Sequence, residues 1–213
     1  MRHVNLPNWL VRIDDNFKWL SIPKLPLFLT IIQAMGFFLV MKKPEFISKL
    51  VLEPSAIFHG EVWRIFTFVA IPLVGNFLVF FVLWFFYDVM VWLESAWGST
   101  LFTVYFLFAW FNTVIASLIT GIPIKTFAYT ECSFFFALAT LNPNREIHLF
   151  FILPMAFRWI ALFIAAVLFV VPLFLGSPER LIYIILLFAN YLIFFGKDYW
   201  LMLKKELDKR KKI

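Results

Sequence analysis

The sequence is poor in the residues on which many enzyme sites depend. It has one cysteine, three histidines and seven glycines among 213 residues. A single cysteine excludes both an internal disulfide and a metal cluster built on several thiolates, and it says little about the redox compartment. We therefore expect no metal and no other cofactor.

Charged residues are also scarce. They make up 15% of the chain, whereas 63% of the residues are apolar and 21% are aromatic. Ordinary soluble chains are about half apolar, and a soluble domain of this size has too little interior to hide so much apolar surface. The composition predicts an all-α polytopic membrane protein that forms one compact bundle.

The net charge of +6 comes largely from the basic C-terminal tail, residues 201–213. A basic segment beside a membrane helix usually fixes topology or contacts anionic lipid. We interpret the tail in this way and expect no nucleic-acid partner.

Six apolar segments follow one another between residues 25 and 200, and we expect each to form a membrane helix. Their approximate ranges are 25–41, 74–93, 100–119, 130–141, 149–171 and 181–195. The fourth is only about 12 residues long, and a helix that crosses a bilayer alone needs about 20 apolar residues. We therefore expect this fourth helix to lie inside the bundle, shielded from lipid.

The N-terminal segment, residues 1–24, is amphipathic. Trp9 and Ile13 recur at helical spacing, and Asp14 and Asp15 fall on the other side. This pattern predicts a short helix in the membrane interface. An irregular leader with scattered aromatic residues is an equal alternative.

The loop formed by residues 44–63 alternates charged and aromatic side chains. It is too polar to span a membrane and too apolar to be free in water, so we expect it to lie half immersed in the interface. Trp63 would anchor its end, and the Arg64 guanidinium would reach headgroups or carbonyl groups.

Six spans place both termini on one side of the membrane. Most lysines and arginines fall on that same side, so the positive-inside rule predicts cytoplasmic termini. The pattern does not distinguish a bacterial inner membrane from the endoplasmic reticulum.

Ionisable residues within spans are costly and mark either function or structural pairing. Asp88 lies in the second span and Arg158 in the fifth, and the two are a possible pair. Glu94 and Gly98 form a Leu-Glu-x-x-x-Gly pattern where the second span meets the third. The glycine permits close helix approach, and we expect the glutamate to cap the third helix or to accept a hydrogen bond there.

Cys132 is a candidate nucleophile at the start of the fourth helix. A reactive thiolate needs a base, usually histidine, within hydrogen-bond reach. The histidines at positions 3, 59 and 148 are badly placed for that role. The simpler interpretation is a buried cysteine that packs as a small hydrophobic residue.

Three motifs occur in a fixed order. Residues 60–67 are Gly-Glu-Val-Trp-Arg-Ile-Phe-Thr, residues 93–98 are Leu-Glu-Ser-Ala-Trp-Gly, and residues 130–133 are Thr-Glu-Cys-Ser. Together with the short fourth helix, they resemble the rhomboid-like superfamily, the fold of the intramembrane serine proteases. The resemblance covers about residues 25–200 and implies a six-transmembrane-helix bundle with a short central fourth helix and a membrane-dipping first loop.

The sequence departs from the proteolytic members of that superfamily at each part of the catalytic site. Cys132 occupies the nucleophile position, and Ser133 replaces a flanking glycine. The family's sixth-helix histidine falls at Asn190 or Tyr191, neither of which is a competent base. The His-x-x-x-Asn of the oxyanion site is missing, and only Asn76 lies near it. Because catalytic triad residues act as a unit, loss of the base alone removes most of the rate enhancement.

The resemblance therefore implies a rhomboid-like pseudoprotease. Such a protein would bind the transmembrane segments of client proteins, for trafficking, quality control or regulation, without hydrolysis. Asp88 and Asn76 are the expected client contacts, and the lipid bilayer is the other expected partner. Residues 76–78 and 194–198 also look like stretches of the non-proteolytic derlins, although that likeness is fainter.

Two alternatives stay open. The first is an active rhomboid-type intramembrane endopeptidase that uses Cys132 or Ser133 with an unrecognised base. The second is a small transporter or channel with Arg158, Asp88 and Asn190 along its path, although the sequence shows no inverted halves or paired broken helices.

Overall fold

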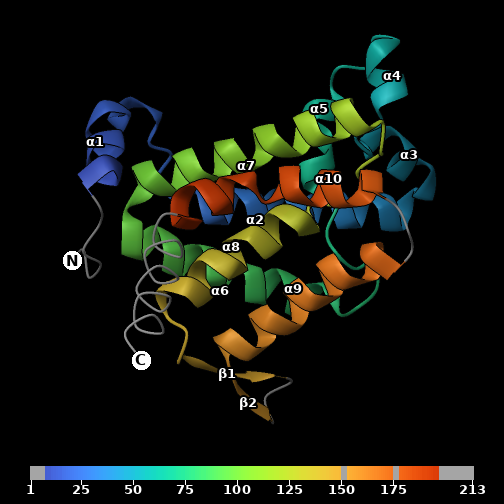
Figure 1. Ribbon diagram of the computed structural model, residues 1–213. Helices are drawn as coiled ribbons and strands as arrows, with labels where there is room; N and C mark the ends of the chain where they lie inside the picture. The colour runs from blue at the N-terminus through green and yellow to red at the C-terminus, as the bar shows by residue number, and fades with distance from the viewer. Residues whose placement is uncertain (1–7, 150–152, 175–177, 197–213) are drawn as a thin grey trace.

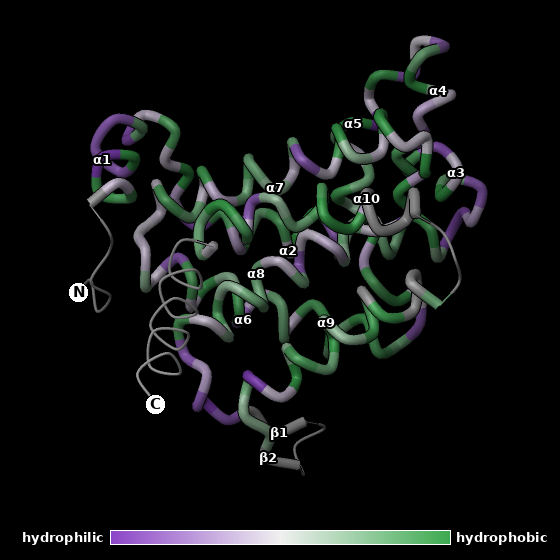
Figure 2. Tube along the Cα trace, in the orientation of Figure 1, coloured by the Kyte–Doolittle hydropathy of each residue, from purple (hydrophilic) through white to green (hydrophobic). Residues whose placement is uncertain are grey.

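The computed structural model describes residues 8–149, 153–174 and 178–196, and these residues are mainly helical (Figure 1). Three helical segments are long and apolar enough to cross a membrane, namely Lys18–Lys42, Val79–Trp97 and Ser99–Thr120. Figure 2 shows hydrophobic residues along most of their length. The helical architecture and the apolar helices point to the membrane-embedded protein that the composition predicts.

The elements follow one another along the chain. The N-terminal part contains α1 (Asn8–Asn16), η1 (Lys18–Leu20) and α2 (Leu25–Lys42). The first loop contains η2 (Pro44–Phe46), α3 (Ile47–Leu50), α4 (Pro54–Phe58), α5 (Arg64–Thr67) and η3 (Phe68–Ala70). The rest contains α6 (Val79–Trp97), α7 (Ser99–Thr120), α8 (Ala128–Leu141), β1 (Glu146–Leu149), β2 (Leu153–Ala156), α9 (Phe157–Phe174) and α10 (Pro178–Leu187). After a turn at Phe188, residues 189–196 are helical again.

Two of the predicted spans begin later than expected. The second begins at Val79 instead of residue 74, and the fifth begins at Phe157 instead of residue 149. Before Phe157, β1 and β2 pair as an antiparallel hairpin. Pro154 lies in β2, and a proline interior to a helix would remove a backbone hydrogen bond and clash with the preceding turn. The hairpin is the exception to the all-α prediction among the described residues.

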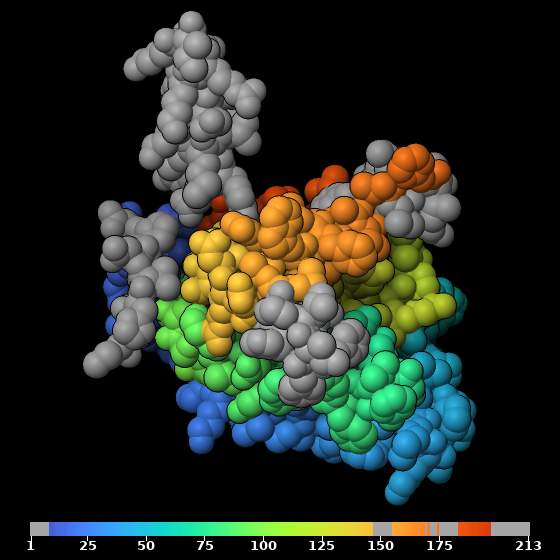
Figure 3. Space-filling model, turned by 90° about the horizontal axis from the view of Figure 1, so that it is seen from below, coloured from blue at the N-terminus to red at the C-terminus, as the bar shows by residue number. Residues whose placement is uncertain are grey.

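The short helix α8 is the centre of the bundle. Ten of its 14 residues are buried, and it packs against α6, α7 and α9. Figure 1 shows it surrounded by these longer helices, and Figure 3 shows α9 lying across the lower face of the molecule beside the end of α8. The predicted position of the fourth helix inside the bundle is confirmed.

The N-terminal helix α1 packs against α7. The Trp9 ring meets the Phe194 ring edge-on at a centroid distance of 5.6 Å. Asp15 is exposed, but Asp14 is only 2% exposed. The prediction that both carboxylates face away from the apolar side is therefore wrong for Asp14. The predicted basic tail, residues 201–213, lies outside the described residues.

The first loop is organised around the Arg64 guanidinium, which is 7% exposed. Its Nη1 donates hydrogen bonds to the backbone carbonyls of Ser48 and Val51, and its Nε donates to the Glu61 carboxylate at 2.7 Å. Trp63, next to it, is about half exposed. The Arg64 guanidinium therefore binds carbonyl groups, as expected. These hydrogen bonds connect α3 to α5 inside the loop.

Helix α2 and the end of the first loop approach each other closely at Gly36. A Cβ atom added at this position would lie 1.9 Å from the Ala70 carbonyl oxygen. Only glycine fits there without moving the backbone. The sequence does not mark Gly36 as special, because the atom that excludes a side chain belongs to a residue 34 positions away in the chain.

We therefore predict that Gly36→Ala destabilises the bundle by about 1–3 kcal/mol, the usual range for overpacking a tight contact. The measurement is the thermal unfolding midpoint of the purified protein in one detergent. Gly75→Ala is the matched control, since a Cβ at Gly75 has no neighbour within 4 Å. Equal midpoints for the two variants would contradict the close approach of α2 to η3.

Candidate functional site

A buried polar cluster joins α8 to two other helices. Ser133 of α8, Tyr105 of α7 and Asn190 of the last helical segment are each fully buried. Asn190 Nδ2 donates a hydrogen bond to Ser133 Oγ at 2.7 Å. The Tyr105 hydroxyl lies 2.8 Å from Ser133 Oγ and donates to the Ser133 backbone carbonyl at 3.1 Å. In the sequence, Tyr105 is 28 residues from Ser133 and Asn190 is 57 residues from it, so the cluster joins distant segments of the chain.

The Ser133 hydroxyl is engaged on two sides. A hydroxyl carries one proton and can accept as well as donate. Ser133 Oγ accepts from the Asn190 amide, and it shares a hydrogen bond with the Tyr105 hydroxyl in which either oxygen could be the donor. A primary amide in this place is a donor and cannot take the serine proton as a histidine would. The arrangement fixes Ser133 but does not activate it.

The structure distinguishes the two possible alignments of the cluster residues. Ser133, and not Cys132, meets Asn190, because consecutive helix residues point about 100° apart. Cys132 is a partly buried neighbour of the hydrophobic core. Tyr191 has a different partner, the Thr140 hydroxyl at 2.8 Å. Of the two candidate residues on the last helical segment, Asn190 is therefore the one that contacts Ser133.

Histidine does not take part in this cluster in the described part of the chain. His59, for example, lies in the first loop, where its Nδ1 is 2.6 Å from the Ser55 carbonyl. Asn190 Oδ1 is buried and has no hydrogen-bond partner among the residues that the structure describes. The cluster can hold three helices together, but it lacks the base that acyl transfer through a serine requires.

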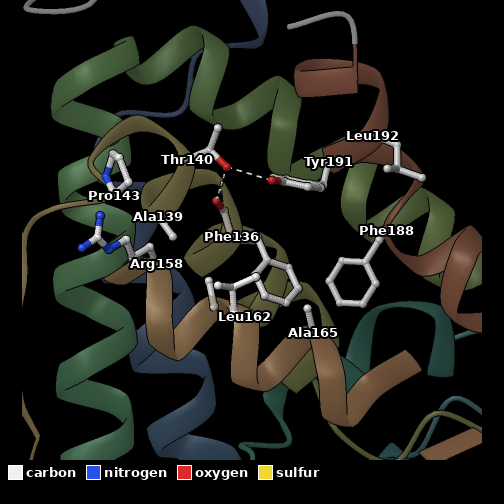
Figure 4. Close-up of a pocket in the computed structure, with 11 residues that line it drawn as sticks. Phe136, Ala139, Thr140, Pro143, Arg158, Leu162, Ala165, Phe188, Tyr191 and Leu192 are labelled. Atoms are coloured by element: carbon white, nitrogen blue, oxygen red, sulfur yellow. Dashed lines mark hydrogen bonds between the residues drawn. The ribbon is translucent and has the colours of Figure 1, made fainter. Parts of the chain in front are cut away.

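A cavity of about 500 Å³ lies between α8, α9 and the stretch that includes Phe188, Tyr191 and Leu192 (Figure 4). Most of its lining is apolar. Thr140 and Tyr191 contribute a hydroxyl pair, and Arg158 lies at the end of the cavity near Pro143. The volume is within the range of about 300–1,000 Å³ that is typical of small-molecule sites.

The cavity and the polar cluster are separated by aromatic rings. Ser133, Phe136 and Thr140 are three and four residues apart, so they share one face of α8. The Phe136 ring packs against Phe188 and Tyr191 at centroid distances of 5.3 Å and 5.9 Å, and its side chain is buried. Ser133 is therefore closed off from the cavity by these rings.

Asp88 lies on an outer face of α6. It is nine residues from either end of this 19-residue helix, it is exposed, and it makes no hydrogen bond or ion pair with any residue that the structure describes. The expected pair with Arg158 does not form, since Arg158 donates instead to Asn144 Oδ1 at 3.1 Å. At the centre of a bilayer, an unpaired Asp costs about 2.5–3.5 kcal/mol on insertion scales.

The other predicted residues have local partners. Glu94 Oε1 accepts hydrogen bonds from the Ser99 hydroxyl at 2.7 Å and from the Lys24 backbone N–H at 3.1 Å. Gly98 has a φ of +87°, which favours glycine, and it ends α6. This corner therefore joins the start of α2, the end of α6 and the start of α7. Asn76 is exposed and accepts a hydrogen bond from the Leu78 backbone N–H at 3.0 Å.

A second buried polar contact was not predicted. Gln33 of α2 donates a hydrogen bond from Nε2 to Glu131 Oε1 of α8 at 2.7 Å, and both side chains are buried. In the described part of the chain, Glu131 Oε2 is buried without a hydrogen-bond partner. The sequence offers one signal for this pair, namely a single polar amide in the first apolar span. The 98-residue separation hides its partner.

No protein-family model, curated protein or solved structure matches the chain. The likeness to rhomboid-like proteins therefore has its basis in the sequence motifs.

We predict that Ser133→Ala destabilises the protein by about 1–3 kcal/mol, because it removes the hydroxyl that accepts the buried Asn190 amide proton and that bonds the buried Tyr105 hydroxyl. The measurement is again the unfolding midpoint in detergent. Cys132→Ala, at the adjacent position, removes one polarisable side chain outside the cluster and should have the smaller effect. A larger loss for Cys132→Ala would contradict the structural role of the cluster.

Proposed function

We propose that this protein is a rhomboid-like pseudoprotease. In this proposal it has six transmembrane helices, of which the short α8 is the fourth and central one, and its termini are cytoplasmic. It binds transmembrane segments of other proteins without cleaving them. The observation that carries the proposal is the exposed Asp88 carboxyl halfway along α6, which has no partner in the described residues. Charged groups within a membrane pair with one another, with backbone carbonyls or with water-filled cavities.

The chemistry of this face indicates the class of client. A transmembrane helix that carries lysine or arginine near its centre would neutralise Asp88. Trp84, one helical turn earlier on the same face, is 52% exposed, and an indole ring attracts a nearby cation through its π face. A carboxyl beside an aromatic ring therefore favours a basic client over a purely apolar one.

The absence of hydrolysis is supported by the polar cluster. The Ser133 hydroxyl is fixed between Asn190 and Tyr105, and it is closed off from the neighbouring cavity by Phe136. The endopeptidase alternative would need a base at this serine, and a primary amide occupies that place. Cys132, the other candidate nucleophile, lies outside the cluster.

The transporter alternative has less support. Arg158 lines the cavity between α8 and α9, but Asp88 and Asn190 do not belong to that lining. The three residues therefore do not share one path in the described part of the chain.

We predict that a leucine-rich transmembrane peptide with one central lysine binds this protein more tightly than the same peptide with leucine there. Interhelical polar contacts in model peptides contribute about 1–2 kcal/mol, so the expected preference is about tenfold. The measurement is photocrosslinking in lipid vesicles from a diazirine amino acid at position 84, with Asp88 intact or replaced by asparagine. Asp88→Asn should remove the preference, and Asp88→Lys should transfer it to a peptide with a central aspartate.

Position 111 provides the matched control for the crosslinker. Phe111 lies on the membrane-length helix α7 and is exposed to the same extent as Trp84, at 52%. A probe there should label lipid and not the peptide. Equal labelling of the lysine and leucine peptides from position 84 would overturn the assignment of Asp88 as a client contact.

We also predict that the purified protein in vesicles does not cleave a generic transmembrane substrate. Mass spectrometry should show the substrate intact after incubation with the unaltered protein, as it should with the variants Ser133→Ala and Cys132→Ala. Cleavage by the unaltered protein that is lost in either variant would establish the endopeptidase function instead and would identify the nucleophile.

A further inference from the structure

We propose that the cavity between α8 and α9 is a binding site for an anionic membrane phospholipid, with one acyl chain inside the cavity and the phosphate on Arg158. This site is separate from the Asp88 face, so the proposal does not depend on client binding.

The shape of the cavity favours a chain over a helix. Its walls are formed by apolar side chains from both sides, including Phe136, Leu162, Ala165 and Leu192 (Figure 4). An α-helix with its side chains is about 10–12 Å across, and here α9 and α10 remain packed against each other. A client helix would therefore have to push α9 and α10 apart, whereas an acyl chain would not. Burial of the methylene groups of the chain away from water is favourable in free energy.

The hydroxyl pair on the wall is hydrogen-bonded within the protein. Thr140 Oγ1 is 2.9 Å from the Phe136 backbone carbonyl. The Thr140 and Tyr191 hydroxyl oxygens lie 2.8 Å apart, and either could be the donor. Both hydroxyls therefore have partners in the protein, and the rest of this wall is apolar and suited to hydrocarbon.

The N–H groups available for binding a headgroup belong to Arg158, at the end of the cavity near Pro143. The Arg158 side chain is exposed, and Nη1 uses one of its N–H groups on Asn144. No carboxylate pairs with Arg158 in the described residues. A guanidinium binds phosphate oxygens in a bidentate manner. Trp159, whose ring centroid is 5.3 Å from the guanidinium carbon, is a residue type typical of the headgroup level. A ligand that fits has an apolar chain and one anionic end.

Two photoactivatable lipids test this inference directly. Phosphatidylglycerol and phosphatidylcholine, each with the same diazirine-bearing acyl chain, are added in trace amounts to nanodiscs that contain the full-length protein. Adducts are mapped by peptide mass spectrometry. We expect adducts at Leu162, Ala165 or Leu192 to be about fivefold more abundant with the anionic lipid, the effect of one basic residue near an anionic headgroup.

Variants separate the charge from the cavity. Arg158→Gln should remove the preference for phosphatidylglycerol, and Arg158→Lys should retain part of it. Arg145→Gln is the charge-matched control, since Arg145 lies over the Trp92 ring at 3.7 Å and does not line the cavity. It should keep the full preference. Ala165→Trp, which fills the cavity, should lower labelling by both lipids there while labelling near Phe111 is unchanged.

Several results would overturn the proposal. Equal labelling by the two lipids would show that Arg158 does not select a headgroup. A preference that survives in Arg158→Gln, or that is lost equally in Arg145→Gln, would assign the effect to general surface charge. Absence of cavity adducts with both lipids, with normal labelling near Phe111, would show that no lipid chain enters.

Discussion

The hydrogen bonds around Ser133 are the interaction on which the arrangement of the central helices depends. A polar group in an apolar interior is costly unless it is hydrogen-bonded, and here one serine bonds an amide nitrogen and a phenol from two other helices. The contact fixes the rotation of α8 about its axis. That rotation then decides which residues face the cavity and places Phe136 between the cavity and Ser133. The same hydrogen bonds occupy the serine hydroxyl, with a primary amide as its neighbour on the last helical segment.

The same constraint explains the corners of the molecule. Arg64 satisfies backbone carbonyls of the first loop that no helix can satisfy, and Glu94 satisfies donors where α2 and α7 begin. In both places one charged side chain stands in for several missing backbone hydrogen bonds at the ends of helices. The motifs around Arg64 and Glu94 are therefore accounted for by structure alone. They do not by themselves imply any catalytic chemistry.

The sequence predicted the features that follow from local pattern. Hydropathy and length placed the short fourth helix inside the bundle, and the Leu-Glu-x-x-x-Gly pattern led to the hydrogen bond at the start of α7. Periodicity alone could not separate the strands β1 and β2 from a helix, because short apolar runs are ambiguous. It also could not pair Gln33 with Glu131 or bring Tyr105 to Ser133, since these contacts depend on distant segments. Cys132 and Ser133 are neighbours in the sequence but point about 100° apart on the helix. Only the three-dimensional structure could therefore decide which of them contacts Asn190.

Asp88 and Arg158 show why failed pairing is informative in a membrane protein. Had they met, each would have satisfied the other, and both would have had a structural explanation. Instead Asp88 lies exposed on α6 and Arg158 lies at the end of the α8–α9 cavity, bonded to a neutral amide. The electrostatic cost of an isolated charge is greatest at the middle of the bilayer and falls toward the headgroups. The two residues therefore call for different partners. The partners that we propose differ accordingly: for Asp88, at mid-helix, a basic group carried within the membrane, and for Arg158, where α9 begins, the phosphate of a lipid.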